Sequence, residues 1–136
     1  MPQRGLIPIL LIALVMTVSG CKTIQEVKEK DSLRSTLRSY EASLRWGDAA
    51  QAYNYLTQAL AEKTELPGDL DNIRVTGYQV TVPPVYLSQH MVTQTAVIEF
   101  IFNDRQVSRS ISDQQTWEFD IDQKHWYRTN PVPAFE

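Results

Sequence analysis

The sequence predicts an α+β fold in which an N-terminal pair of helices packs on an antiparallel β-sheet. Apolar residues recur at helical spacing up to about Lys63, whereas from Ile73 onward apolar and polar residues alternate as they do in half-buried strands. The strand segments follow one another directly, and turn-forming residues separate them, which is typical of an antiparallel meander. We therefore expect one domain with its helices first and its sheet second.

The N-terminus has the layout of an export signal. Arg4 precedes an apolar run from Leu6 to Val18, which is shorter than the roughly 20 residues that a membrane-spanning helix needs. Directly after this run, Val18-Ser19-Gly20-Cys21 resembles the bacterial lipobox, in which a cysteine behind two small residues accepts a diacylglycerol on its sulfur. The alternative is a cysteine that follows a hydrophobic run by chance.

The lipobox resemblance implies a processed and anchored protein. Residues 1–20 would be removed as a lipoprotein signal peptide, Cys21 would become the lipidated N-terminus, and residues 21–32 would form a tether to one domain over residues 33–136. Acyl chains of this kind, such as palmitate, hold a protein on a membrane surface. Lys22 follows the cysteine in place of an aspartate, which implies the outer membrane, with the domain facing the periplasm.

The composition is that of a folded, mildly acidic domain. Hydrophobic residues make up 43% of the 136 residues, and the net charge is -3. Removal of residues 1–20 takes away one charged residue, Arg4, and leaves 12 basic against 16 acidic side chains, a net charge of -4. This balance argues against nucleic-acid binding, which requires a clustered basic face. Cys21 is the single cysteine, so its acylation would leave the domain without a disulfide, a thiol nucleophile or a cysteine metal ligand.

Two helices are predicted before the sheet. The first reaches about Trp46, because four apolar residues at spacings of four, three and four share one helical face: Leu33, Leu37, Tyr40 and Leu44. Polar residues before this stripe leave open whether the helix starts earlier or follows a solvated spacer. Gly47 is expected to end the helix, and the carboxylate of Asp48 is expected to cap a second helix from Ala49 to about Lys63.

The first two strands are predicted on either side of a double proline. The segment from Ile73 to Val82 alternates as a strand, in which Gly77 permits a bulge, and Pro83-Pro84 is expected to end it. The longest strand candidate runs from Gln89 to Phe102 and places on one face Val92, Ala96, Ile98, Phe100 and Phe102.

Two further strands are predicted after short turns. Asn103-Asp104 is a turn signal, after which a return strand from Gln106 carries on one face Trp117, Phe119 and Ile121. A last hairpin is expected to turn at residues 122–124 into the strand His125–Arg128, and the prolines at 131 and 133 prevent any further strand. The predicted sheet is thus a meander.

This order of elements resembles the NTF2-like (cystatin-like cone) superfamily, in which a helix pair packs into the concave face of a strongly curved antiparallel sheet. The resemblance rests on the helix junction Leu44-Arg45-Trp46-Gly47-Asp48-Ala49-Ala50, on Trp117-Glu118-Phe119 at the end of the long hairpin, and on Trp126-Tyr127 after the next turn. It implies a pocket enclosed by the sheet and, at the level of the fold, a homodimer formed through the exposed sheet face. A generic α+β sandwich of helices on an antiparallel sheet is the alternative.

The residues singled out for a pocket are Trp46, His90, Trp117, Trp126 and Tyr127. Some NTF2-like proteins use a buried Asp or His as a general base beside a Tyr or Asp donor, and by that criterion Asp120 and His125 are candidates too. However, Asp120 lies between Phe119 and Ile121 on a strand, and His125 adjoins a turn. We therefore expect the side chains of both to lie on the solvent-exposed face of the sheet. The aromatic residues form either a ligand-stacking wall or, as we favour, part of the core.

No motif in the sequence indicates a catalytic site. The two histidines stand 35 positions apart, and there is no glycine-rich phosphate loop and no Gly-x-Ser-x-Gly nucleophile elbow. We therefore predict no metal and no cofactor, and a membrane-anchored envelope lipoprotein that binds a protein, lipid or cell-wall component or supports an assembly. The alternative is a small-pocket NTF2-like enzyme or small-ligand carrier. An open cavity with Asp or His beside Tyr would favour that alternative. A cavity filled by Trp117, Phe119 and Leu side chains would favour a binding or structural role.

Overall fold

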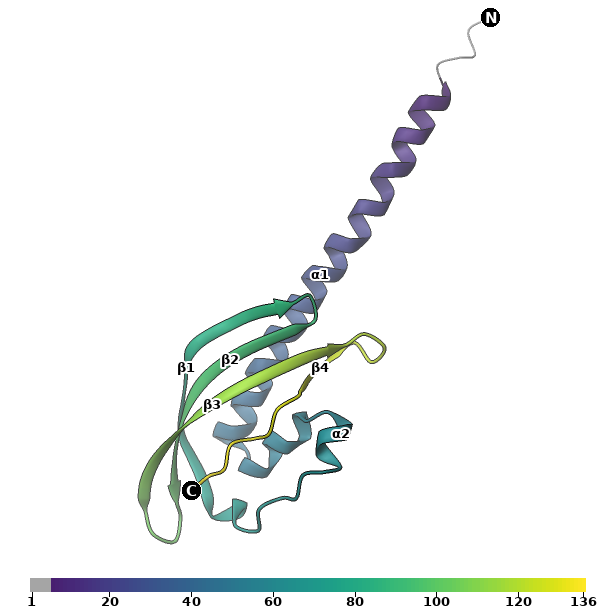
Figure 1. Ribbon diagram of the computed structural model, residues 1–136. Coiled ribbons are helices and arrows are strands. Elements are labelled where there is room, and N and C mark those ends of the chain that lie inside the picture. Colours follow the sequence, from purple (N-terminus) through teal and green to yellow (C-terminus); the bar gives the residue numbers. More distant parts are fainter. Residues whose placement is uncertain (1–5) are drawn as a thin grey trace, which may run out of the picture.

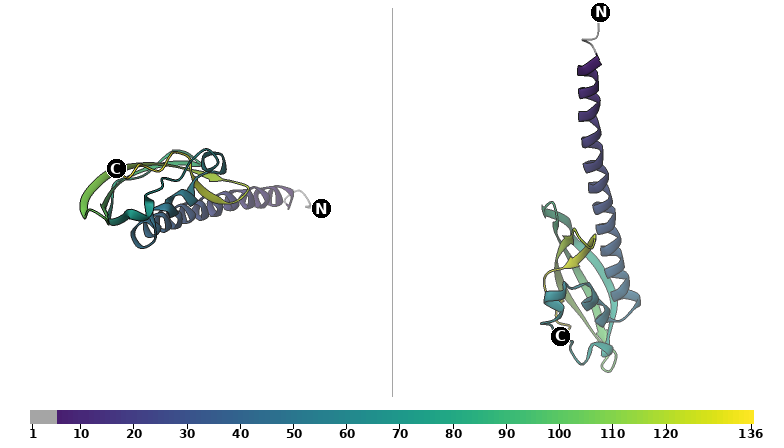
Figure 2. Two further views of the ribbon diagram at one scale, coloured as in Figure 1. Left: turned by 90° about the horizontal axis from the view of Figure 1, so that it is seen from below. Right: turned by 90° about the vertical axis from the view of Figure 1, so that its right-hand side faces the viewer.

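The computed structural model describes the backbone of residues 6–136 and the side chains of residues 20–136. The C-terminal part of a long helix, α1 (Leu6–Trp46), lies along a four-stranded antiparallel sheet, and its residues 20–28 extend beyond the sheet with exposed side chains (Figure 1). Figure 2 shows α1 along one face of the sheet from two other directions. The fold is therefore α+β, with helix before sheet as predicted. Among the described residues, no helix is long and apolar enough to cross a bilayer.

One face of α1 holds it against the sheet. Three members of the predicted apolar stripe, Leu33, Tyr40 and Leu44, are at most 3% exposed. The fourth, Leu37, is half-buried. The helix ends where predicted, because the N–H of Gly47 donates to the carbonyl of Ser43 at 3.0 Å. The cap that follows is confirmed as well, since Asp48 Oδ1 accepts the N–H of Ala50 at 2.9 Å. Residues 21–32 are helical and continuous with α1.

The prediction of a single helix over residues 49–63 is wrong. The segment forms a 3₁₀-helix, η1 (Ala49–Tyr55), and one separate turn of α-helix, α2 (Gln58–Ala61). Between the two, the N–H of Thr57 donates to the carbonyl of Arg128, on the last strand, at 2.9 Å. This long-range bond takes the place of a helical one, so tertiary contact overrides the local helical pattern.

The sheet has four strands, each antiparallel to the next and arranged in sequence order: β1 (Ile73–Ser88), β2 (Met91–Phe102), β3 (Val107–Asp120) and β4 (His125–Arg128). A 3₁₀-helix, η2 (Leu70–Asn72), leads into β1. The meander and the bounds of β4 are as predicted. The apolar face of β2 is also confirmed, because the following side chains are at most 4% exposed: Val92, Ala96, Ile98, Phe100 and Phe102.

The expectation that Pro83-Pro84 ends the first strand is wrong. β1 continues through both prolines to Ser88, with register shifts on either side of Val82. Proline has no N–H to donate, but β1 is an edge strand that pairs on one side with β2, so its ladder tolerates the two prolines. The predicted bulge is confirmed by a register shift between Val75 and Gly77.

The core lies between the inner face of the sheet and the elements that cover it. Three aromatic side chains from β3 and β4 fill its centre and are at most 6% exposed: Trp117, Phe119 and Trp126. The C-terminal tail closes one end, since Phe135 packs edge-on against Phe100 with 5.2 Å between ring centroids. Ile121, which was predicted to share the inner face of β3, is instead 59% exposed. The reason is that β3 ends at Asp120, whose carboxylate accepts the N–H groups of the next turn.

Candidate functional site

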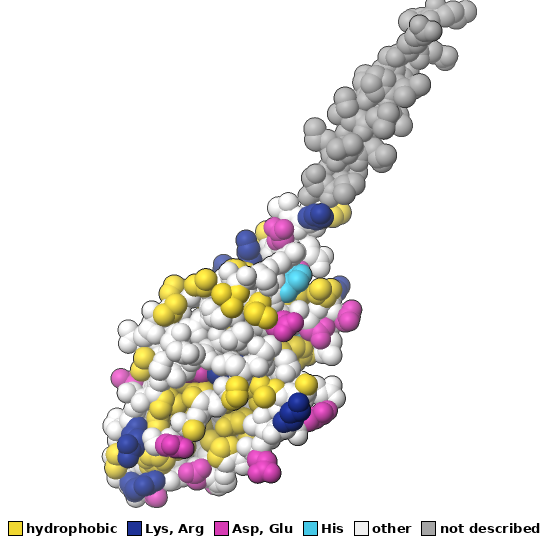
Figure 3. All heavy atoms as spheres, in the orientation of Figure 1, with side chains coloured by type: hydrophobic (Ala, Val, Ile, Leu, Met, Phe, Trp, Pro, Cys, Tyr) yellow, Lys and Arg dark blue, Asp and Glu magenta, His cyan; other side chains and the backbone are white. Residues whose placement is uncertain are grey.

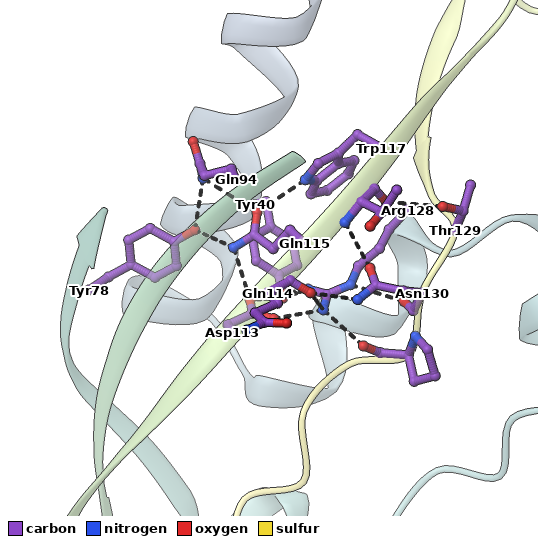
Figure 4. Close-up of polar contacts among 12 residues, drawn as sticks. Tyr40, Tyr78, Gln94, Asp113, Gln114, Gln115, Trp117, Arg128, Thr129 and Asn130 are labelled. Atoms are coloured by element: carbon purple, nitrogen blue, oxygen red, sulfur yellow. Dashed lines mark hydrogen bonds and ion pairs between the residues drawn. The ribbon is translucent and has the colours of Figure 1, made fainter. Parts of the chain in front are cut away.

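A polar network lies inside the core, where α1, β3 and β4 meet (Figure 4). The side chains of Asp113 and Arg128 are 0% and 1% exposed and form a bidentate ion pair. Arg128 Nη2 lies 2.6 Å from Asp113 Oδ1, and Arg128 Nη1 lies 3.1 Å from Asp113 Oδ2. Tyr40 contacts both partners, because its hydroxyl accepts from Nη1 at 2.7 Å and donates to Asp113 Oδ2 at 3.1 Å. Charge-assisted hydrogen bonds thus join the helix to two strands.

Gln115 extends this network along β3. Its Nε2 donates to Asp113 Oδ2 at 2.9 Å and to the hydroxyl of Tyr78 at 2.7 Å. Its Oε1 accepts the indole N–H of Trp117 at 3.1 Å and an N–H of Gln94 at 3.3 Å. The amide nitrogen and the amide oxygen of Gln115 are therefore both engaged, as buried polar groups require.

Arg128 also fixes the C-terminal tail. Its Nε donates to the carbonyl of Asn130 at 3.1 Å, and its Nη2 donates to the carbonyl of Pro131 at 2.8 Å. The side chain of Asn130 in turn accepts the N–H of Thr116 at 2.8 Å, which holds the tail beside β3. One buried arginine thereby links the helix, the sheet and the tail.

Electrostatics keep the network in one protonation state. Burial raises the pKa of Tyr40 well above its ordinary value, and it raises the pKa of Tyr78 to about 12. Burial alone would lower the pKa of Arg128, but its interactions with Tyr40 and Asp113 outweigh burial and raise that pKa. The tyrosines stay neutral and the arginine stays charged at physiological pH. The buried ion pair at the centre of this network stabilises the fold and is not open to a substrate, whereas Tyr78, at the periphery of the network, is half-buried.

The sequence contains a signal for this network that we did not use. Asp113 and Gln115 fall at the same alternating positions of β3 as Trp117, and Arg128 falls two residues after Trp126 on β4. Polar residues at core-facing positions of neighbouring strands predict a buried, paired cluster. Only the positions of the side chains in the structure show that the two charges meet.

A second polar contact joins α1 to the turn between β1 and β2. His90 Nδ1 lies 3.3 Å from Glu29 Oε2, although that nitrogen is buried and makes no aligned hydrogen bond. The ring of His90 stacks on Phe119 with 5.9 Å between centroids. The backbone carbonyl of Glu29 accepts the indole N–H of Trp126 at 3.2 Å. His90 and Trp126, two residues of the predicted pocket, are thus both in contact with Glu29.

The other predicted residues lie apart from this contact. Trp117 is buried at 0% exposure in the centre of the core. Tyr127 is half-buried on β4, where its hydroxyl donates to Gln123 and its ring contacts that of His125. Trp46 was expected to pack in the core but is 80% exposed, with the guanidinium of Arg45 5.0 Å from its ring centre. Trp46 lies two positions after the buried Leu44, a turn of about 200° around the helix, so it faces solvent.

A partly open hollow of about 420 Å³ lies between α1 and β1. Its walls are mainly apolar and include Leu33, Leu37, Val80, Pro84 and Tyr86. An adjoining hollow of about 340 Å³ shares Lys30 and Tyr86 with it and continues towards the N-terminal part of the helix. We call the two together the α1–β1 groove.

Charged residues of α1 border the groove, and two polar side chains lie in its wall. Lys30, Arg34 and Arg38 line the larger hollow together with a single acid, Glu41. Tyr78 and Gln94, which belong to the wall, connect the groove to the buried network through Gln115. The high pKa of Tyr78 makes its hydroxyl a hydrogen-bond donor or acceptor and not a base at neutral pH. None of the described residues that line the groove is an Asp or a His.

The described part of the chain contains no group of three His, Cys, Asp or Glu side chains that could hold a metal ion. Cys21, the predicted lipidation site, is exposed on α1. The chain matches no protein-family model, and no curated protein or solved structure is significantly similar to it.

Proposed function

We propose that this protein is a lipoprotein of the bacterial cell envelope that binds a partner non-catalytically in its α1–β1 groove. The observation that carries the proposal is the larger hollow of the groove, an apolar hollow of about 420 Å³ with a basic border, which lies beside an ion pair that is closed to solvent. Sites that hold ligands are typically concave and mainly apolar with a few polar groups, and this volume falls in their range.

The distribution of acidic and basic groups favours binding over catalysis. The Asp and Tyr side chains that come together do so in the closed network, where Asp113 is 0% exposed. The larger hollow offers Glu41 among three cations, and the adjoining hollow adds Glu26 and Glu29. Tyr78 has a pKa of about 12, which is too high for a general base near neutral pH. Aromatic side chains fill the rest of the space between helix and sheet, as a binding or structural role requires.

The proposed anchor is the lipid on Cys21, which would hold the chain on the periplasmic face of the outer membrane. Residues 21–28 are helical and exposed, so they would act as a spacer of about 12 Å between membrane and domain. The larger hollow of the groove, which is lined from Lys30 onward, would then lie beyond this spacer. An NTF2-like fold is part of the same proposal, and the long strands β1–β3 with a helix along their inner face support it.

The anchor is tested by the intact mass of the protein from the membrane fraction of a bacterial host. A chain that begins at Cys21 with added acyl mass, and the absence of this species from the Cys21→Ala variant, is the expected result. An unmodified chain that retains residues 1–20 would contradict the lipoprotein proposal.

The groove is tested by site-specific photocrosslinking in the same host. A photoreactive amino acid replaces Val80, which lines the groove and is 42% exposed, or Val107, which lies outside it and is 41% exposed. We expect an adduct, protein or small molecule, at position 80 and none at position 107. Equal labelling at the two positions, or none at position 80, would refute binding in the groove.

A small-ligand carrier is the second candidate, because the enclosed volume suits a drug-sized or single-chain ligand. The mass of the adduct at position 80 separates the two. An adduct of a few hundred daltons would indicate a carrier, and a polypeptide adduct would indicate a protein-binding domain.

A further inference from the structure

β1 is an edge strand whose protection against pairing with other chains consists of Pro83-Pro84 and the register shifts of its ladder, without charged side chains. From Val75 to Ser88 the sequence contains no charged residue, although charges, lysine above all, are the common means of blocking an exposed edge. Five apolar side chains of this stretch are 42–60% exposed: Val80, Val82, Val85, Tyr86 and Leu87. Figure 3 shows hydrophobic side chains gathered over the end of the sheet that the β1–β2 hairpin forms. An edge of this length and polarity is suited to being covered.

The α1–β1 groove runs beside this edge, and its larger hollow has an excess of positive charge, whereas Glu26 and Glu29 line the adjoining hollow. Lys30, Arg34 and Arg38 follow one another at intervals of four residues on α1, so they lie in a row along one face of the helix. Arg34 has a weak exposed partner, with Nη1 3.5 Å from Asp31 Oδ1. Among the described residues, neither Lys30 nor Arg38 is in an ion pair. The row is thus available to an anionic partner.

We propose that an extended, acidic and apolar segment of another envelope protein adds to the sheet as a strand at the edge of β1. Its backbone would pair with the open side of β1, and alternate side chains would enter the groove. Acidic side chains on that face would meet Lys30, Arg34 and Arg38. This inference rests on the proposed function and names the class of partner that the groove takes.

Three features of the site favour a polypeptide over other occupants. An edge strand offers backbone hydrogen bonds along its length, which an acyl chain cannot use. The exposed helical spacer over residues 21–28 separates the larger hollow of the groove from the proposed membrane surface. A second copy of this chain is disfavoured, because pairing of two β1 edges would bring two basic rows together without neutralising them.

The double proline limits where the added strand can pair. Pro83 and Pro84 have no N–H, so donors are available before them and from Val85 to Ser88 after them. Because Val80 lies before the prolines and Tyr86 lies after them, the groove borders both parts of the edge. We therefore expect a segment of about ten residues, bound most closely before the prolines.

The probe for this proposal is a pool of synthetic peptides of about ten residues. Alternate positions hold Val, Ile, Leu, Phe or Tyr, and the remaining positions hold Glu, Lys, Ser or Thr. The full lipidated protein is presented in phosphatidylcholine vesicles, and bare vesicles remove peptides that bind lipid. We expect the retained peptides to be richer in Glu and poorer in Lys than the pool. Retained peptides that are neutral or basic, or no retention, would overturn the proposal.

Two comparisons then test how the best peptide binds. Replacement of Arg34 and Arg38 together by Glu should weaken binding about tenfold or more, whereas Lys63→Glu, an exposed charge reversal outside the groove, should not. N-methylation of alternate peptide nitrogens removes the donors of one strand edge and leaves every side chain, and it should abolish binding. Unchanged binding in either comparison would overturn strand addition against the basic row.

The outcomes separate this inference from the proposed function. If no peptide is retained but photocrosslinking at position 80 gives a small-molecule adduct, the polypeptide partner is refuted and binding in the groove stands. If neither experiment gives a signal at the groove, both proposals fail.

Discussion

Replacement of Arg128 by Met tests how strongly the buried network holds the fold together. The change removes a guanidinium that is 1% exposed and leaves Asp113, at 0% exposure, without its ion-pair partner. Breaking a buried pair on one side costs about 3–5 kcal/mol, because the remaining charge is desolvated and uncompensated. The tail also loses the bonds to the carbonyls of Asn130 and Pro131. Since a domain of this size has about 5–15 kcal/mol of stability, the variant should be close to unfolding.

A double-mutant cycle separates the ion pair from the packing around it. Asp113→Leu alone should also be costly, since it strands the guanidinium of Arg128 in the core. The combination of Asp113→Leu with Arg128→Met leaves no buried charge, so we expect it to cost at least about 2 kcal/mol less than the sum of the single changes. Arg109→Met, on an exposed position of β3, serves as the control and should change the free energy of unfolding by less than about 0.5 kcal/mol.

The assay is urea unfolding of a chain that comprises residues 22–136. This chain contains every side chain of the described core, which extends from Glu29 to Phe135. Trp117 and Trp126 are both 0% exposed, so their fluorescence reports the loss of the core. An Arg128→Met variant that loses less than about 1 kcal/mol, or single changes that simply add, would refute the account of the network as a coupled structural unit.

Three other results are expected from the same assay. Trp117→Ala should cost about 3–5 kcal/mol, whereas Trp46→Ala, at an 80% exposed position, should cost less than about 0.5 kcal/mol, and similar costs would contradict the burial described. Asp48→Ala should cost about 1 kcal/mol through the lost cap bond to Ala50, and no loss would show that the cap does not matter. Folding raises the pKa of Tyr78 from 10.0 to about 12. The neutral hydroxyl of Tyr78 therefore makes its full contribution to the free energy of unfolding below pH 10, and this contribution is lost as the pH rises towards 12. Tyr78→Phe should therefore make the unfolding free energy fall less steeply over that range, by up to about 2–3 kcal/mol in total, and an unchanged slope would contradict the shift.

The sequence predicted those elements that local chemistry determines. Gly47 and Asp48 end one helix and cap the next through bonds to residues two to four positions away, and such contacts are visible in the sequence. The alternation of β2 from Val92 to Phe102 was sufficient to assign its buried face, because one side of the strand packs on the core throughout. The bounds of β4 followed from the turn before it.

The errors occur where a distant segment decides the local structure. The helical pattern of residues 49–63 is broken because Thr57 bonds to β4, which lies about half the chain length away. The double proline failed to end β1 because that strand has a free edge, a fact that only the strand order reveals. Trp46 is a different case, since its angular position on α1 relative to Leu44 already placed it on the solvent side.

The candidate site was the least predictable part, because it depends on how two elements pack. Lys30, Arg34 and Arg38 share a helical face in the sequence, but nothing local indicates that this face borders the apolar side chains of β1. The network of Asp113 and Arg128 was visible only as polar residues at core-facing positions. The register pairs Arg128 with Trp117, four residues after Asp113, so their meeting depends on the path of the long arginine side chain through the core. The five residues singled out for a pocket were chosen by type, and the structure distributes them between the core, the β1–β2 turn and the surface.

Hydrogen exchange of the protein in its own membrane tests the central claim, that the α1–β1 groove is the site of binding. Exchange is measured by mass spectrometry for envelope vesicles from the host and for the purified lipoprotein in phosphatidylcholine vesicles. We predict that amides of β1 between residues 79 and 88 exchange more slowly in the envelope than in the purified protein, while the turn at residues 103–106 exchanges equally in both. Equal exchange of β1 in the two preparations would contradict occupation of the groove.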